Sequence, residues 1–87
     1  MSSVSFSIQI KGSARKALEA IPQVHRDRIR RAIDALGENP YAGQPLAGQF
    51  SGTRRIRVGT YRVLYEIHRD ELWVLVIRVA SRGSAYR

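Results

Sequence analysis

The most chemically distinctive part of the sequence is RRIRVGTYRVLY, residues 54–65, where four arginines lie among residues that favour β-strands. They are Arg54, Arg55, Arg57 and Arg62. A two-residue hairpin turn at Gly59-Thr60 would set Arg57 opposite Arg62 with Cβ atoms about 5 Å apart, and like charges at that spacing destabilise a sheet. Guanidinium groups are always charged and bind phosphate oxygens bidentately. The cluster therefore favours a phosphate site over arginines that simply extend into solvent, without selecting among anions.

The overall charge also indicates an anionic partner. The 87 residues contain fifteen Lys and Arg against seven Asp and Glu, which gives a net charge of +8. An excess of this size suits nucleic acid, an anionic membrane surface or an acidic protein. The hydrophobic share of 44% and the charged share of 25% are ordinary for a globular protein. A chain of this length predicts a single domain, residues 1–87.

Several kinds of site and location are disfavoured by what the sequence lacks. There is no cysteine, which excludes disulfides and thiolate metal sites and suits the cytoplasm. The longest apolar run, LWVLVI at residues 72–77, is too short to cross a bilayer, and the N-terminus shows no secretion signal, so we expect no membrane association. Because the sequence also shows no metal-ligand cluster, phosphate-binding glycine loop or nucleophile triad, we expect no metal and no cofactor.

The elements that must position the arginines follow from the hydrophobic pattern. Residues 4–10 alternate between apolar and polar, which predicts a half-buried strand. Apolar residues at helical spacing predict two helices, one with Ser13 as its N-cap and one from near Pro22 to Leu36. Residues 37–53 are rich in Gly and Pro and predict a loop. Three more strands are predicted near residues 54–58, 60–69 and 71–80.

Two-residue turns at Gly59-Thr60 and Arg69-Asp70 would decide which side chains share a face of the sheet. One face would be uniformly apolar and pack on the helices: Ile56, Val58, Tyr61, Val63, Tyr65, Ile67, Leu72, Val74 and Val76. The other, here called the arginine face, would carry Arg55, Arg57, Arg62, Leu64, Glu66, His68, Trp73, Leu75 and Ile77. The predicted fold is therefore α+β, a small two-layer domain in the order β-α-α-β-β-β, with a helix hairpin packed on one face of a mainly antiparallel sheet.

The arginine face has two features that bear on function. No predicted element covers its apolar strip of Trp73, Leu75 and Ile77, so we expect another molecule to cover it. Glu66 and His68 share this face, but His68 lies six residues along the strand from Arg62, about 20 Å at 3.3 Å per residue. An acid–base pair at that distance cannot act on a phosphate held by Arg62.

This order of elements, the pattern R-x-G-x-Y-R-V-x-Y-E-I at residues 57–67 and the terminal SRGSAYR resemble the RelE/ParE superfamily of toxin–antitoxin toxins. The resemblance covers nearly the whole chain and is closer to the RelE branch, whose members are ribosome-dependent mRNA endonucleases. It implies a metal-independent endoribonuclease that inhibits translation. Two alternatives stay open: a ParE-like inhibitor of DNA gyrase, and a non-catalytic binding protein with the toxin fold.

The resemblance also implies roles for single residues. Arg55 and Arg57 match two basic positions of the RelE second strand, and Arg62 matches the arginine of a tyrosine–arginine step. Arg82 and Tyr86 match an arginine just past the last strand and the tyrosine that follows it. The implied catalytic residues are Arg55, Arg57, Arg62, Arg82 and Tyr86, and the implied RNA-binding residues are Arg54, Arg55, Arg57, Arg62 and Arg82.

The sequence departs from the family pattern at the general base. The family often has a His-Arg pair at the end of the last strand, whereas this chain has Ser81-Arg82. The best-studied RelE pattern has lysines where this chain has Arg55 and Arg57. Because an arginine in a protein effectively cannot lose its proton, neither position supplies a base.

Two partners follow from the resemblance. One is a cognate antitoxin that lays a segment over the sheet and contacts Arg57, Arg62, Trp73 and Leu75, which makes a toxin–antitoxin hetero-oligomer. The other is mRNA on the ribosome, where the basic run at residues 25–31 could touch ribosomal RNA. That run is better explained as a solvated helix face.

Overall fold

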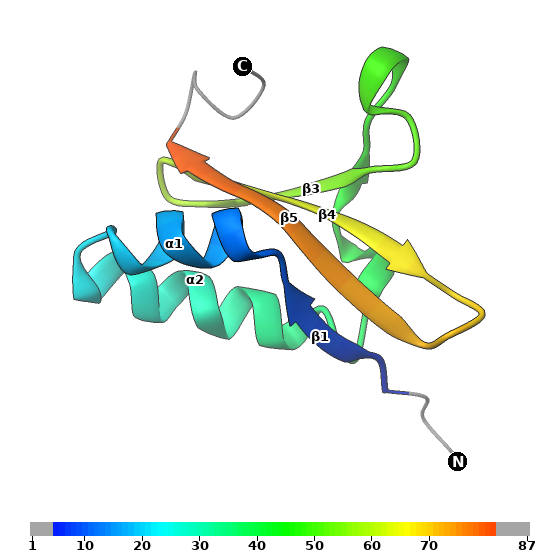
Figure 1. Ribbon diagram of the computed structural model, residues 1–87, viewed down its shortest axis with the longest axis horizontal. Coiled ribbons are helices and arrows are strands. Elements are labelled where there is room, and N and C mark those ends of the chain that lie inside the picture. Colours follow the sequence, from blue (N-terminus) through cyan, green and yellow to red (C-terminus); the bar gives the residue numbers. More distant parts are fainter. Residues whose placement is uncertain (1–4, 82–87) are drawn as a thin grey trace.

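A computed structural model of the chain describes residues 5–81. Two helices pack on one face of a five-stranded sheet with the strand order β1-β5-β4-β3-β2 (Figure 1). The elements are β1 (Ser7–Ile10), α1 (Gly12–Glu19), α2 (Gln23–Ala35), β2 (Gln44–Pro45), β3 (Arg54–Val58), β4 (Tyr61–His68) and β5 (Trp73–Ser81), with short 3-10 helices η1 (Pro40–Ala42) and η2 (Gly48–Phe50). The β1–β5 pair is parallel and the other pairs are antiparallel. The predicted α+β two-layer fold is confirmed, although the two-residue strand β2 was not expected within the loop.

The core lies between the helices and the sheet. It consists of Ala14, Leu18, Ile29, Ile33, Leu36, Val63, Tyr65, Val74, Val76 and Val79. The helical members recur at i and i+4, and those of β4 and β5 recur at every second position up to Val76, so each element presents one apolar side. Each fully buried aliphatic side chain stabilises the fold by about 1.5–3 kcal/mol. No helix within residues 5–81 is long and apolar enough to cross a membrane.

The start of α1 differs from the prediction. The N-cap is Lys11, which makes no side-chain capping bond, and Ser13 lies inside the helix. The reason is that Lys11 N–H still donates to the Val76 carbonyl of β5, so the chain passes directly from the sheet into the helix. The second helix begins after Pro22, as expected from a residue whose φ is fixed.

The two hairpin turns behave differently. Gly59 has a φ of 61°, and Val58 faces Tyr61 as predicted for a two-residue turn. The predicted two-residue turn at Arg69-Asp70 is wrong, because His68 pairs with Trp73 and the connection spans residues 69–72. A tight hairpin turn needs positive φ at its central positions, which Gly and Asn adopt most easily and Arg-Asp does not. Leu72 has a φ of 57° and is 45% exposed, so it is not on the core face.

A β-bulge divides the pairing of β4 with β5. Tyr65 pairs with Val76 but the preceding residue, Leu64, pairs with Arg78, so β5 contains one extra residue at this point. Beyond the bulge the alternation of β5 is reversed, so that Val79 joins the core, whereas simple alternation from Val74 and Val76 would have placed Arg78 there. The predicted faces of β5 therefore hold from Trp73 to Val76 and fail beyond the bulge.

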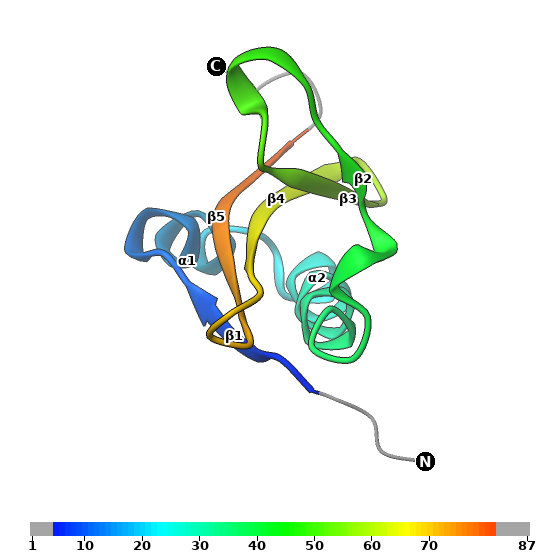
Figure 2. The ribbon, with the colours of Figure 1, turned by 90° about the vertical axis from the view of Figure 1, so that its right-hand side faces the viewer.

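The segment between α2 and β3 adds an edge strand to the sheet. It passes along the edge of the sheet as β2 and then rises, with η2, on the side away from the helices (Figures 1 and 2). Leu64 points to the arginine face and yet is only 1% exposed. Leu64 is therefore buried at the centre of the arginine face, whereas Trp73, Leu75 and Ile77 of the predicted apolar strip are half-buried.

Candidate functional site

The β3–β4 hairpin gathers three of the predicted arginines on the arginine face. Arg57 pairs directly with Arg62, and Arg55 pairs with Leu64 two positions along. Side chains two residues apart on a strand point to the same face, so the three guanidinium groups emerge on one side of the sheet. Arg57 is exposed, whereas Arg55 and Arg62 are half-buried. The cross-strand pairing of two like charges is therefore a feature of the folded protein.

Arg55 is held in place from the edge of the sheet. Its Nη2 donates to Oε1 of Gln44, on the neighbouring strand β2, at 2.7 Å. Holding one end of a guanidinium limits the conformations that it would lose on binding a ligand. The short edge strand thus has a direct part in positioning the site.

Arg78 is a fourth arginine of this face, and the sequence analysis missed it. The β-bulge turns it into register with Leu64, so that one row across the sheet runs Arg55, Leu64, Arg78. Arg78 is half-buried. A signal was present in the sequence, because strict alternation from Val74 and Val76 would place a charged residue, Arg78, on the core face. Strict alternation instead placed Ile77 on the arginine face.

Two neighbouring hollows mark where a ligand would contact these arginines. One of about 180 Å³ lies at the hairpin turn between Arg57 and Arg62. Another of about 370 Å³ is bordered by Gln44, Arg55 and Arg57. Arg57 borders both hollows, so they lie next to each other along the hairpin, an arrangement that suits an extended anion better than a small enclosed ligand.

Arg54 does not belong to this group. It pairs with the buried Tyr65 and so lies on the helix side of the sheet. Its Nε donates to the Gly43 carbonyl at 3.2 Å and its Nη2 to the Tyr41 carbonyl at 3.4 Å, and its guanidinium lies 5.2 Å from the centre of the Tyr41 ring. These contacts bind the η1 segment to β3. The placement separates Arg54 from the predicted RNA-binding arginines and gives it a structural role.

Tyr65 holds the same segment from the core. Its hydroxyl donates to the Pro40 carbonyl at 2.6 Å and accepts from the Gly43 N–H at 3.0 Å. Burial raises the pKa of Tyr65 above 10.0, against the opposing effects of the Gly43 N–H and of Arg54. A Cβ at position 43 would lie 2.5 Å from this hydroxyl, so only glycine fits there. Through Gly43, Tyr65 also fixes the neighbouring Gln44 that holds Arg55.

The far end of the arginine face is apolar and acidic. Trp73 and Leu75 are half-buried there, and the Trp73 ring stacks on His68 at 4.2 Å with an interplanar angle of 9°. His68 Nε2 lies 3.2 Å from Glu66 Oε1. The predicted apolar strip is therefore partly covered by a side chain of its own face. The face as a whole changes from basic at the Gly59 turn to apolar and acidic at the other end.

Comparison with known proteins decides the family. The model of the family described as the ParE toxin of type II toxin–antitoxin system, parDE, matches residues 8–86. The chain belongs to the RelE/ParE superfamily of toxins. The predicted resemblance is thereby confirmed, and the protein is a toxin of a type II toxin–antitoxin system.

Relatives of this toxin are similar over almost their whole length. Toxin RelG of Mycobacterium tuberculosis is 31% identical over 84 residues, which cover 94% of this chain and 97% of the relative. Toxin RelE of the same organism is 29% identical over 84 residues, or 94% of this chain and 87% of the relative. Among solved structures, the RelBE2 toxin–antitoxin complex of Mycobacterium tuberculosis has a TM-score of 0.84 at 29% identity and covers 93% of this chain and 95% of that chain. The RelE–RelB complex of Pyrococcus horikoshii has a TM-score of 0.79 at 26% identity and covers 93% and 99%.

Two residues implied as catalytic in this toxin, Arg82 and Tyr86, lie outside the described residues. Their place in the site stays a prediction. They follow β5, whose last residue, Ser81, pairs with Tyr61 beside the Gly59 turn. In the described part of the toxin, Arg55, Arg57 and Arg62 therefore share the arginine face with Arg78, whereas Arg54 lies on the opposite face.

Proposed function

We propose that this toxin is a ribosome-dependent mRNA endonuclease that acts in the cytoplasm and needs no metal. The observation that supports it most strongly is the direct pairing of Arg57 with Arg62 on an outward face. Such a pair opposes folding, by about 0.2–1 kcal/mol for directly opposed like charges, and a bound phosphate removes the repulsion. Similarity to toxins named RelG and RelE favours RNA among the possible anions.

The chemistry would be attack of a ribose 2′-OH on the adjacent phosphodiester. The 2′-oxygen bonds to phosphorus and loses its proton to a base, while the bond to the 5′-oxygen of the next nucleotide breaks and that oxygen takes a proton. Arg55, Arg57 and Arg62 would hold the scissile phosphate and offset the charge that develops on its oxygens. The arginines cannot supply the base, because they stay charged at any physiological pH.

The two residues beyond Ser81 complete the proposal. Arg82 would contact a phosphate or protonate the leaving oxygen by way of a water molecule. Tyr86 would stack on a base, where an aromatic ring contributes about 1–3 kcal/mol. Arg78 would add positive charge at the centre of the arginine face, beside Leu64 and Arg55.

The proposed partner in the cell is a cognate antitoxin, in a toxin–antitoxin hetero-oligomer. The similar structures from Mycobacterium tuberculosis and Pyrococcus horikoshii are toxin–antitoxin complexes. An antitoxin segment on the arginine face would set acidic residues against Arg57 and Arg62 and bury the half-exposed Trp73 and Leu75. It would thereby occupy the surface that the mRNA needs.

One observation favours a second candidate function. The family model that matches is that of the ParE toxin, so inhibition of DNA gyrase is the alternative to mRNA cleavage. A translation reaction and a gyrase supercoiling assay with the antitoxin-free toxin separate the two. Cleaved mRNA at ribosomes with unchanged supercoiling supports the endonuclease. Intact mRNA with inhibited supercoiling refutes it, and no effect in either assay leaves only a non-catalytic binding protein.

A further inference from the structure

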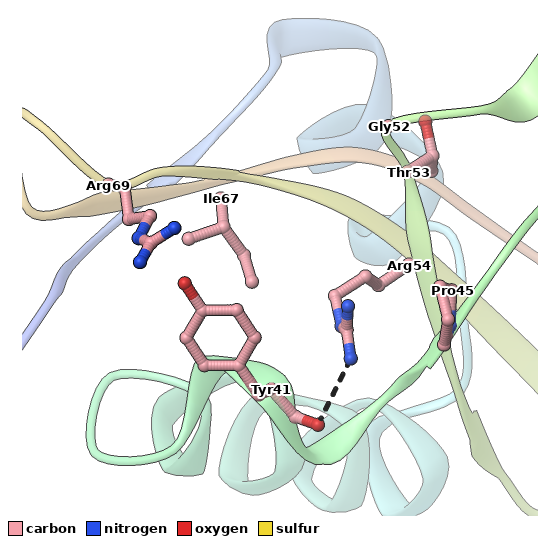
Figure 3. A pocket seen from close by; sticks show the side chains of 7 residues that line it. All are labelled: Tyr41, Pro45, Gly52, Thr53, Arg54, Ile67 and Arg69. Atoms are coloured by element: carbon pink, nitrogen blue, oxygen red, sulfur yellow. Dashed lines mark hydrogen bonds between the residues drawn. The ribbon is translucent and has the colours of Figure 1, made fainter.

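A second arginine-containing pocket lies on the other side of the sheet from the arginine face. It has a volume of about 250 Å³, and its walls include Tyr41, Pro45, Thr53, Arg54, Ile67 and Arg69 (Figure 3). Arg54 pairs with the core residue Tyr65, and Ile67 packs against the core, so both face the helix side. The proposed RNA site on the arginine face is therefore separated from this pocket by the sheet itself.

The pocket has a preformed cationic wall. Arg54 is fixed by its bonds to the Gly43 and Tyr41 carbonyls and by the Tyr41 ring beside it. A guanidinium has five N–H donors, so one that is oriented by two bonds can still bind a carboxylate. Because the group is already ordered, binding to it costs little conformational entropy.

Arg69 supplies a second cation from the turn after β4. Its guanidinium is directed toward the hydroxyl end of Tyr41, across the pocket from Arg54 (Figure 3). None of the residues that line the pocket is acidic, so two positive charges share it without a carboxylate. Ile67, Pro45 and the Tyr41 ring provide apolar walls.

We propose that this pocket binds the carboxylate of an acidic side chain from the antitoxin, as an anchor separate from the arginine face. The two guanidinium groups match the carboxylate, and the apolar walls match the methylene stem of a Glu. Because apolar walls suit a methylene stem, a protein side chain fits this pocket better than a phosphate does. The naming of the partner rests on the proposed function, whereas the carboxylate chemistry rests on the pocket alone.

The test follows backbone amide shifts of Gly52, Thr53 and Ile67 by NMR while a blocked Ala-Glu-Ala tripeptide is added to the free toxin. We expect saturable shifts at these amides and none with the neutral Ala-Gln-Ala peptide. Arg69→Gln should weaken binding about tenfold, because it removes a charge-assisted bond. The matched control is Arg28→Gln, which removes the same charge from the exposed surface of α2 and should change nothing. Absence of saturable shifts, or equal binding by Arg69→Gln and wild type, overturns the proposal.

Two further arms identify the source of the ligand. Uridine 5′-monophosphate should bind these amides more weakly than the Glu peptide, and tighter binding would make the pocket a nucleotide site instead. Purified cognate antitoxin should displace the peptide, and a peptide that stays bound in the complex would refute the antitoxin as occupant. Neither arm measures cleavage, so a toxin that fails to cut mRNA would overturn the proposed function and leave this result intact.

Discussion

Replacing Arg57 by Gln should lower activity and raise stability at the same time. Arg57 is exposed and directly faces Arg62 in the β3–β4 hairpin. Gln keeps most of the side-chain length and removes the charge, so the substitution relieves a like-charge pair that costs about 0.2–1 kcal/mol. At about 4–8 °C per kcal/mol for a domain of this size, relief of about 0.5 kcal/mol raises the melting temperature by about 2–4 °C.

The expected loss of activity is much larger than this gain. Removal of one preorganised donor that stabilises a transition-state oxyanion typically lowers the rate by about 100- to 1,000-fold, or about 2.7–4 kcal/mol. The assay is mRNA cleavage in a translation reaction with purified toxin, alongside a thermal melt of the same sample. Substitution of a residue needed only for folding would lower the cleavage rate and the melting temperature together. A lower cleavage rate with a higher melting temperature would therefore identify Arg57 as a ligand-binding residue.

Two controls test the electrostatic reasoning. Arg15→Gln removes one charge from the exposed surface of α1, and we expect cleavage within about threefold of wild type, since a surface substitution away from the site usually changes little. Raising the salt concentration to about 1 M shortens the Debye length to about 3 Å, so the gain in melting temperature of Arg57→Gln should shrink. Wild-type cleavage by Arg57→Gln, or a melting temperature that falls by several degrees, would refute the reasoning.

Three other predictions address stability and the C-terminal tyrosine. Tyr65→Phe removes the hydroxyl that bonds Pro40 and Gly43, and the free energy of unfolding should fall by about 2–4 kcal/mol, seen as a fall in melting temperature of about 8–32 °C. Because burial raises the pKa of Tyr65 above 10.0, the wild type should lose stability as pH rises through that pKa, and the Phe variant should lack this contribution. Leu72→Gly should stabilise the turn by about 1 kcal/mol in a thermal melt, because Leu72 has a φ of 57°; an unchanged melt would contradict strain there. Tyr86→Phe should retain most mRNA cleavage and Tyr86→Ala should lose it at an unchanged melting temperature, whereas equal failure of both would implicate the hydroxyl.

Much of the fold and half of the site follow from local sequence patterns. Helical spacing identifies the two helices, and period-two alternation with a Gly at position 59 identifies the β3–β4 hairpin. Because a two-residue turn leaves only one register, the same pattern also decides that Arg57 opposes Arg62 and that Arg55 shares their face. These features depend on residues that are near one another in the chain, which is why the sequence by itself determined them.

The remaining features depend on contacts between distant residues, and only the tertiary structure decided them. The alternation of β3 places Arg54 on the helix side, but its contacts there, with Tyr41 and Gly43, come from the distant η1 segment. Arg78 joins the arginine face because a bulge in β5 shifts the pairing of this strand with β4 by one residue. The connection at residues 69–72, which is longer than the predicted turn, also changes which residues of β4 and β5 pair. Neither a bulge nor the path of a loop produces a repeating pattern of apolar residues in the sequence. Both are determined by how the folded chain packs. Residues close together in the sequence thus determine the pairing of Arg57 with Arg62. The position of Arg78 and the second pocket depend on contacts between residues far apart in the sequence.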